Sequence, residues 1–176
     1  LIENRLKEFG KLDKIKLITI DPSKKIKLKN FNLSFLTTAH SIPEPHSISI
    51  ETKYGKLLHT ADWKIDKEPT LGNEIDIESF KKIGNDGLLA LIGDSTNADV
   101  PGFSKSESEV KNELIKVFSR YNQRIVITCF SSNIARMNSI VNAAKKNNRK
   151  VALVGRSMKK TIEAAIKNKI IKDDIN

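Results

Sequence analysis

Three residues that could do chemistry follow predicted strands of this sequence. His40, Asp62 and Asp94 each come directly after an apolar run. Side chains at strand ends lie on loops that a rigid sheet holds in place, and layered α/β folds build active sites there. Imidazole and carboxylate together suit Zn²⁺ or Mn²⁺, and a carboxylate can bridge two ions that hold a hydroxide for attack on phosphorus. The alternative is that these residues only form turns and caps, because the sequence has no close His-x-His pair.

The other two histidines predict supporting roles. His59 lies inside the strand that ends at Asp62, so its side chain should point to the opposite face, as a core or supporting histidine. His46 lies in a loop with two prolines, and an exposed loop histidine is the simplest interpretation.

Two predicted strand–helix junctions could hold a phosphate group. The first follows the apolar run 124–130, and the second follows the run 150–155. The free N–H groups and partial positive charge of a helix N-terminus bind phosphate readily. Ser and Asn are also the commonest helix caps, so capping alone could explain either junction. An arginine near each junction favours a phosphate site. The candidate residues are Ser131, Ser132 and Asn133 at the first junction, and Arg156 and Ser157 at the second.

The pattern of predicted strands and helices that position these residues changes near Pro101-Gly102. The earlier part predicts mainly hairpin strands at 14–20, 24–28, 30–38, 47–52, 56–60 and 87–92, with helices at 1–9 and 75–82. The later part predicts helices at 104–120, 133–146 and 157–169, and strands at 124–130 and 150–155. Its first helix would open with a capping box, Ser104 to Glu107. Strands that alternate with helices predict a parallel sheet, with both junctions at one edge.

Composition sets wider bounds. The net charge of +10 favours a nucleic-acid partner, although dispersed lysines could equally form an ordinary solvated surface. The single cysteine, Cys129, fits a reducing cytosol and allows no internal disulfide. No apolar run approaches the ~20 residues of a membrane helix. The sequence opens without methionine inside a predicted helix, and we expect it to be an internal part of a longer protein.

The motifs around these residues resemble, in order, those of the ribonuclease J family. They are His40-Ser41-Ile42-Pro43-Glu44, His59-Thr60-Ala61-Asp62-Trp63-Lys64-Ile65-Asp66, Gly93-Asp94-Ser95-Thr96-Asn97-Ala98, Pro101-Gly102-Phe103, Phe130-Ser131-Ser132-Asn133-Ile134 and Val154-Gly155-Arg156-Ser157-Met158. The resemblance implies an α/β fold: part of a metallo-β-lactamase αββα sandwich at 1–100, then part of a β-CASP domain with a parallel sheet at 101–176. It also implies a cytoplasmic 5′-to-3′ exonuclease and endonuclease that decays and matures RNA, usually as a homo-oligomer and without a membrane.

The resemblance also implies roles for single residues. His40 would be a zinc ligand, Asp62 the carboxylate that bridges two zinc ions, and Asp94 a support of the catalytic centre, with Mn²⁺ or Mg²⁺ as possible substitutes for zinc. The first junction would contact the RNA phosphate, with Arg156 and Ser157 nearby. The family usually has glycine where this chain has Ala61. Its other metal ligands have no counterpart among these residues, so we expect no cleavage by the chain alone.

Two alternatives stay open. One is a different hydrolase of the metallo-β-lactamase fold that acts on DNA or on a small phosphodiester. The other is a non-catalytic module that binds a nucleotide in its later half.

Overall fold

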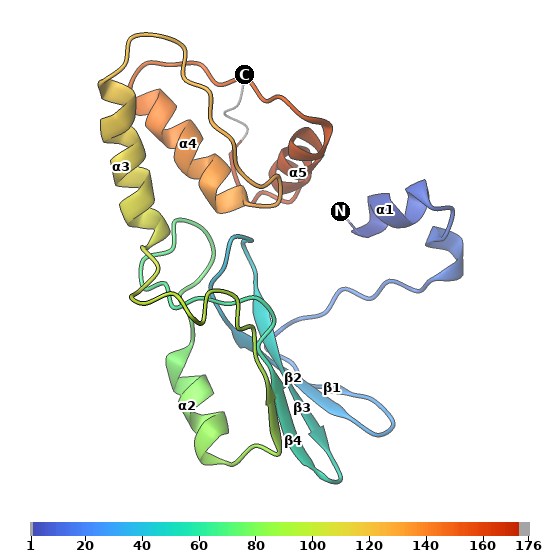
Figure 1. Ribbon diagram of the computed structural model, residues 1–176. Coiled ribbons are helices and arrows are strands. Elements are labelled where there is room, and N and C mark those ends of the chain that lie inside the picture. Colours follow the sequence, from blue (N-terminus) through green and yellow to red (C-terminus); the bar gives the residue numbers. More distant parts are fainter. Residues whose placement is uncertain (1, 173–176) are drawn as a thin grey trace.

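The first half of the chain forms a five-stranded sheet whose strands lie in sequence order (Figure 1). We describe it from a computed structural model, which covers residues 2–172. The strands are β1 (Ile26–Lys27), β2 (Asn32–Thr37), β3 (His46–Thr52), β4 (Gly55–His59) and β5 (Ala90–Ile92). Strands β1 to β4 pair antiparallel, whereas β4 and β5 pair parallel through a crossover that contains helix α2 (Ile77–Asn85). The parallel pair is the one that carries two site candidates.

The turn between β3 and β4 shows why this hairpin forms where the sequence predicts it. Thr52 pairs with Gly55, and the Thr52 hydroxyl donates a hydrogen bond to the Gly55 carbonyl over 2.9 Å. Gly55 has φ +143°, which side chains disfavour. A Cβ atom there would also lie 3.1 Å from the Leu89 side chain. Glycine therefore fixes both the turn and the close approach of the segment that leads into β5.

The predicted strand at 14–20 is wrong. The chain begins with helix α1 (Ile2–Glu8) and a short 3-10 helix, η1 (Leu12–Lys14), after which residues 16–20 run extended without pairing to any described strand. Ile18 is 70% exposed as a result. An apolar β pattern becomes a strand only where a neighbouring edge can pair with it.

The second half is a group of three helices: α3 (Glu107–Ser119), α4 (Ile134–Lys146) and α5 (Arg156–Lys167). Buried Phe118 of α3 packs on Ala143 and Ala144 of α4, and these small residues let the two helices approach closely. The capping box that opens α3 joins Ser106 and Glu109, so the predicted pair Ser104 and Glu107 is wrong. The sequence contains this motif twice, and Glu107 is occupied elsewhere.

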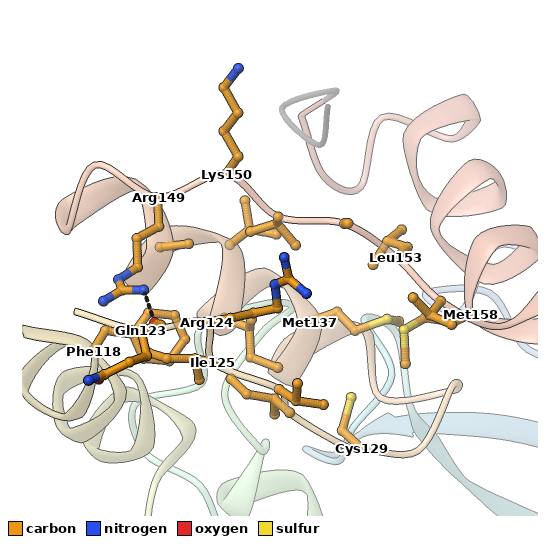
Figure 2. A pocket seen from close by; sticks show the side chains of 18 of the residues that line it. Phe118, Gln123, Arg124, Ile125, Cys129, Met137, Arg149, Lys150, Leu153 and Met158 are labelled. Atoms are coloured by element: carbon orange, nitrogen blue, oxygen red, sulfur yellow. Dashed lines mark hydrogen bonds between the residues drawn. The ribbon is translucent and has the colours of Figure 1, made fainter. Parts of the chain in front are cut away.

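The predicted parallel sheet of the second half is not present among residues 2–172. Residues 124–130 and 150–154 are extended, and both run in the same direction along α4 (Figure 2), but neither pairs with a described strand. Ile125, Ile127 and Cys129 turn toward the helices, whereas Val126 is 82% exposed. A pocket lies between the two segments. The predicted αββα sandwich stays a prediction, since the described residues form one sheet.

Candidate active site and phosphate junctions

Asp62 and Asp94 lie at one end of the sheet because they follow two parallel neighbouring strands. The Thr60 N–H donates to the Ile92 carbonyl over 3.0 Å, just past the paired strands. The Asp94 N–H then donates to the Thr60 hydroxyl over 2.9 Å. The carboxyl ends of parallel strands share an edge of the sheet, so the topology places both carboxylates on the same side of the molecule.

His40 reaches the same edge through a separate bridge. Ala39 pairs with Lys64 outside the named strands, and the Lys64 N–H donates to the Ala39 carbonyl over 2.8 Å. The pKa of Asp94 is lowered chiefly by the hydrogen bonds that its carboxylate accepts from Thr96, and the nearby His40 adds a smaller electrostatic contribution. The three strand-end candidates thus lie along one edge of the sheet, but residues 2–172 do not gather them into a single group that could hold a metal ion.

The donor types at this edge fit zinc, but they are too few for a complete site. One ring nitrogen of His40 lies 3.1 Å from the Ser41 hydroxyl, which orients the imidazole and leaves its second nitrogen for a ligand. Asp62 is exposed. Zinc takes about four ligands, and residues 2–172 contain no group of three or more His, Cys, Asp or Glu that could hold a metal ion. His40 and Asp62 therefore stay candidate ligands, and the described residues do not form a complete metal site.

Ala61, next to Asp62, has a strained backbone conformation. Its φ is +53°, in the left-handed region where a Cβ atom costs about 1 kcal/mol or more. The Ala61 N–H donates to a ring nitrogen of His59 over 3.0 Å. His59 is exposed, so the expected core position is wrong, and its observed contact stabilises this turn. The glycine that relatives were expected to carry here would relieve the strain.

His46 has a structural environment of its own. It is the first residue of β3, half-buried, and not part of an exposed loop as we expected. Its ring donates to the Glu44 carbonyl over 3.0 Å and meets the Phe35 ring edge-on, with 6.4 Å between the ring centroids. These contacts orient the start of β3.

At the first junction, the backbone donors of α4 are already used. The Asn133 side chain accepts from the Arg136 N–H over 2.8 Å, as a helix cap does. The Ile134 N–H donates to Ser132, and the Ala135 N–H donates to the Ser41 carbonyl over 3.4 Å. Capping therefore explains the backbone of this junction, and a phosphate group would have to use its serine side chains.

The second junction keeps its donors. Gly155 precedes α5 with φ +124° and supplies no side-chain cap. Among the described residues, the N–H groups of Arg156, Ser157 and Met158 make no hydrogen bond. Arg156 and Ser157 are exposed. A helix N-terminus with free amides, a small residue before it and an exposed arginine can bind a phosphate group.

The two junctions are neighbours. Cys129, which precedes the first, and Met158 of the second both pack against the buried cluster that contains Ile134 and Met137. Both extended segments also run toward this end of α4 (Figure 2). A single anion could therefore contact side chains from both junctions.

Asp66 connects the loop that follows Asp62 to the second half of the chain. It is not among the candidate site residues of the sequence analysis. Its carboxylate is 1% exposed and lies 2.8 Å from the Lys64 ammonium. It accepts hydrogen bonds from the N–H groups of Glu107 over 3.1 Å and Glu68 over 3.0 Å. Burial would raise the pKa of Asp66, but these hydrogen bonds outweigh it and lower the pKa to about 2. The signal that the sequence offered for Asp66 was an acidic residue in the same motif as Asp62.

The connection continues through Glu107 to α4. Both oxygens of the buried Glu107 carboxylate accept hydrogen bonds from the Arg136 guanidinium, over 2.9 and 3.1 Å. Two parallel bonds fix the relative orientation of the two side chains. Arg136 is therefore engaged as a structural cation, and Arg156 is the arginine left near the junctions.

The comparisons with known proteins agree on one family. Residues 122–174 match the family model described as Ribonuclease J, beta-CASP domain. The chain is 39% identical over 173 residues to a Ribonuclease J of Synechocystis, which covers 98% of this chain and 27% of that protein. It is 36% identical over 174 residues to the Ribonuclease J2 of Bacillus subtilis, covering 99% of this chain and 31% of that protein.

A solved structure shares the fold. A protein of unknown function from Enterococcus faecalis superimposes with a TM-score of 0.55 at 14% identity, over 80% of this chain and 39% of that one.

Residues 2–172 include no helix with the length and apolar character needed to cross a membrane. By sequence the chain is similar to ribonuclease J proteins along nearly its whole length, which confirms the resemblance of its motifs, and it spans less than a third of the length of these curated relatives.

Proposed function

We propose that this chain is part of a metal-dependent ribonuclease, one that shortens RNA from its 5′ end, cuts it internally, and serves RNA decay and maturation in the cytoplasm. Residues 1–100 would contribute to a metallo-β-lactamase domain and residues 101–176 to a β-CASP domain. The match of nearly the whole chain to proteins named Ribonuclease J supports this proposal, as does the net charge of +10.

The observation that carries the proposal is the contact between the two candidate sites. The Ser41 carbonyl, next to His40, accepts the Ala135 N–H of the first turn of α4 over 3.4 Å. A phosphodiester seated at the junctions would therefore lie beside the edge that presents the metal-ligand candidates. Cleavage requires the RNA phosphate to lie next to the metal-ligand candidates, because the scissile phosphorus must reach the nucleophile.

Each residue of the edge then has a role. His40 would be a ligand, Asp62 would bridge two zinc ions, or Mn²⁺ or Mg²⁺ in their place, and Asp94 would orient the edge through Thr60. Such ions would supply a hydroxide for attack on phosphorus and would offset the negative charge that develops on the phosphate oxygens. Ligands from outside this chain would have to complete the set.

The junctions would hold the RNA backbone. The free amides and side chains of Arg156 and Ser157 would bind one phosphate group, and the side chains of Ser131 and Ser132 would face it from the segment before α4, which Asn133 caps. Backbone recognition of this kind is largely independent of base sequence and weakens with salt.

Mutation of Asp62 tests the proposal. In the full-length protein, Asp62→Ala should abolish cleavage of a single-stranded RNA while RNA binding is kept, whereas Asp21→Ala, at an exposed carboxylate that contacts Ser23 and Lys24, should retain turnover. Normal turnover by Asp62→Ala would remove Asp62 from the metal site. Preference for DNA or a small phosphodiester over RNA would favour the other hydrolases of this fold.

The chain alone should be inactive, because it carries two of the required ligands. Robust metal-dependent RNA cleavage by residues 1–176 would contradict this. A homo-oligomer is the expected assembly of the full-length protein, to be checked by light scattering.

A further inference from the structure

Four charged side chains form a cluster where the sheet meets the helices: Lys64, Asp66, Glu107 and Arg136. The two carboxylates are almost completely buried, since the side chain of Asp66 is 1% exposed and that of Glu107 is 8% exposed. The two cations lie nearer the surface. Two negative charges face two positive charges, so the cluster as a whole is neutral.

The cluster extends from one half of the proposed site to the other. Lys64 lies two residues after Asp62. Arg136 lies in the first turn of α4, where its N–H donates over 2.8 Å to the side chain of Asn133, the cap of the first junction. One end of the cluster is therefore tied to the loop of metal-ligand candidates, and the other end is tied to a junction that would hold the phosphate group.

Glu107 contacts both ends of the cluster. It is the first residue of α3, which begins beside the loops of the sheet and runs alongside α4 (Figure 1). Its N–H donates to the Asp66 carboxylate over 3.1 Å, and its two carboxylate oxygens accept from Arg136 over 2.9 and 3.1 Å. A single residue therefore sets the spacing between the metal-ligand loop and the junction.

The pair of Glu107 and Arg136 supplies orientation more than stability. A buried ion pair often stabilises a fold no more than well-packed apolar residues of similar volume would. Two parallel hydrogen bonds between a guanidinium and a carboxylate, by contrast, fix one relative geometry. The Glu107 side chain is too buried to contact a bound RNA, so its effect on cleavage would pass through the groups that it holds.

We propose that Glu107 is a positioning residue for RNA cleavage: through Asp66 and Arg136 it fixes the distance between the phosphate junction and the metal-ligand edge. This inference rests on the proposed function. A misplacement of about 1 Å far from the reacting atoms can lower a reaction rate about 100-fold. The length of the Glu107 side chain therefore matters for kcat, and not its charge alone.

Two substitutions of Glu107 in the full-length protein separate length from charge. Glu107→Asp keeps the charge but shortens the side chain by one methylene group, about 1.5 Å, whereas Glu107→Gln keeps the length and one acceptor oxygen. With a 5′-phosphorylated single-stranded RNA, Glu107→Asp should lower kcat about 100-fold and leave KM within about threefold. Glu107→Gln should lower kcat less but melt at a lower temperature than Glu107→Asp, because it leaves the Arg136 charge unpaired. Stability alone cannot place the two variants in opposite orders.

Glu113→Asp is the matched control. It makes the same change on the same helix, at an exposed ion pair with Lys116. Its kcat and KM should equal those of the unmodified protein.

Amide hydrogen exchange of the full-length protein measures the positioning without RNA. The Ala135 N–H, which donates to the Ser41 carbonyl across the two halves, should exchange at least about tenfold faster in Glu107→Asp. The Arg136 N–H should exchange at its former rate, because its acceptor, Asn133, caps the same helix.

The outcomes separate this inference from the proposed function. An unchanged kcat in Glu107→Asp would overturn the inference, and so would a larger loss of kcat in Glu107→Gln than in Glu107→Asp. Unchanged exchange of the Ala135 N–H would also overturn it. If the unmodified full-length protein does not cleave RNA, the proposed function fails; faster Ala135 exchange in Glu107→Asp would then uphold the spacing that Glu107 sets and reject its part in cleavage.

Discussion

Asp66→Asn is the substitution that tests the connection between the two halves most directly. The Asp66 carboxylate is 1% exposed, and hydrogen bonds from Lys64, Glu107 and Glu68 hold its pKa at about 2 instead of 3.8. A pKa difference of that size corresponds to about 2 kcal/mol of folding free energy. Because the folded pKa is lowered, this stability is fully present above the unfolded pKa of 3.8 and is lost as the pH falls through about 2.

Urea unfolding followed by circular dichroism measures the effect. At pH 7 we expect Asp66→Asn to lower the free energy of unfolding by about 2 kcal/mol relative to the unmodified chain. At about pH 2 the difference should shrink to a fraction of that value, because the carboxyl is then about half protonated in the folded chain and almost fully protonated in the unfolded chain. Asp21→Asn is the control, since this carboxylate bonds to Ser23 but is exposed, and the change should be small at any pH.

The comparison across pH is decisive. A variant that loses the same free energy at pH 7 and at about pH 2 would show that shape, and not charge, makes residue 66 important. A variant as stable as the unmodified chain at pH 7 would refute the role of the carboxylate altogether.

Three further predictions follow from named contacts. Ala61→Gly should stabilise the chain by up to about 1 kcal/mol in thermal unfolding, because φ +53° strains any residue with a Cβ atom. Glu107→Ala should destabilise it by about 2 kcal/mol, and a double-mutant cycle with Arg136→Ala should show strong coupling; additive losses would contradict the ion pair. In the full-length protein, Arg156→Gln should weaken RNA binding and reduce the salt slope by about 0.7, as one lost phosphate contact does, whereas Asn133→Ala should cost about 1 kcal/mol of stability and leave that slope unchanged.

The site could be predicted from sequence where short-range patterns decide it. Asp62 and Asp94 lie at one end of the sheet because they follow two parallel neighbouring strands, and the hairpin at Gly55 follows from local turn chemistry. The failures depend on distant partners. Residues 14–20 carry a strand pattern, but no edge is there to pair with them. No sequence spacing reveals that Asp66 would meet Glu107, since 41 residues separate them.

The capping of α3 shows how a distant contact decides a local choice. Two overlapping Ser-x-x-Glu motifs offer start points two residues apart, and both satisfy the same local rule. The structure uses the second, because the side chain of Glu107 is bound to Arg136 and its N–H to Asp66.

The buried contacts between the two halves have a mechanical meaning. Asp66 with Glu107, and Ser41 with Ala135, bridge the sheet and the helices at separate points beside the site. Separating the halves there would expose a paired carboxylate and break both bridges, so jaw-like opening is costly.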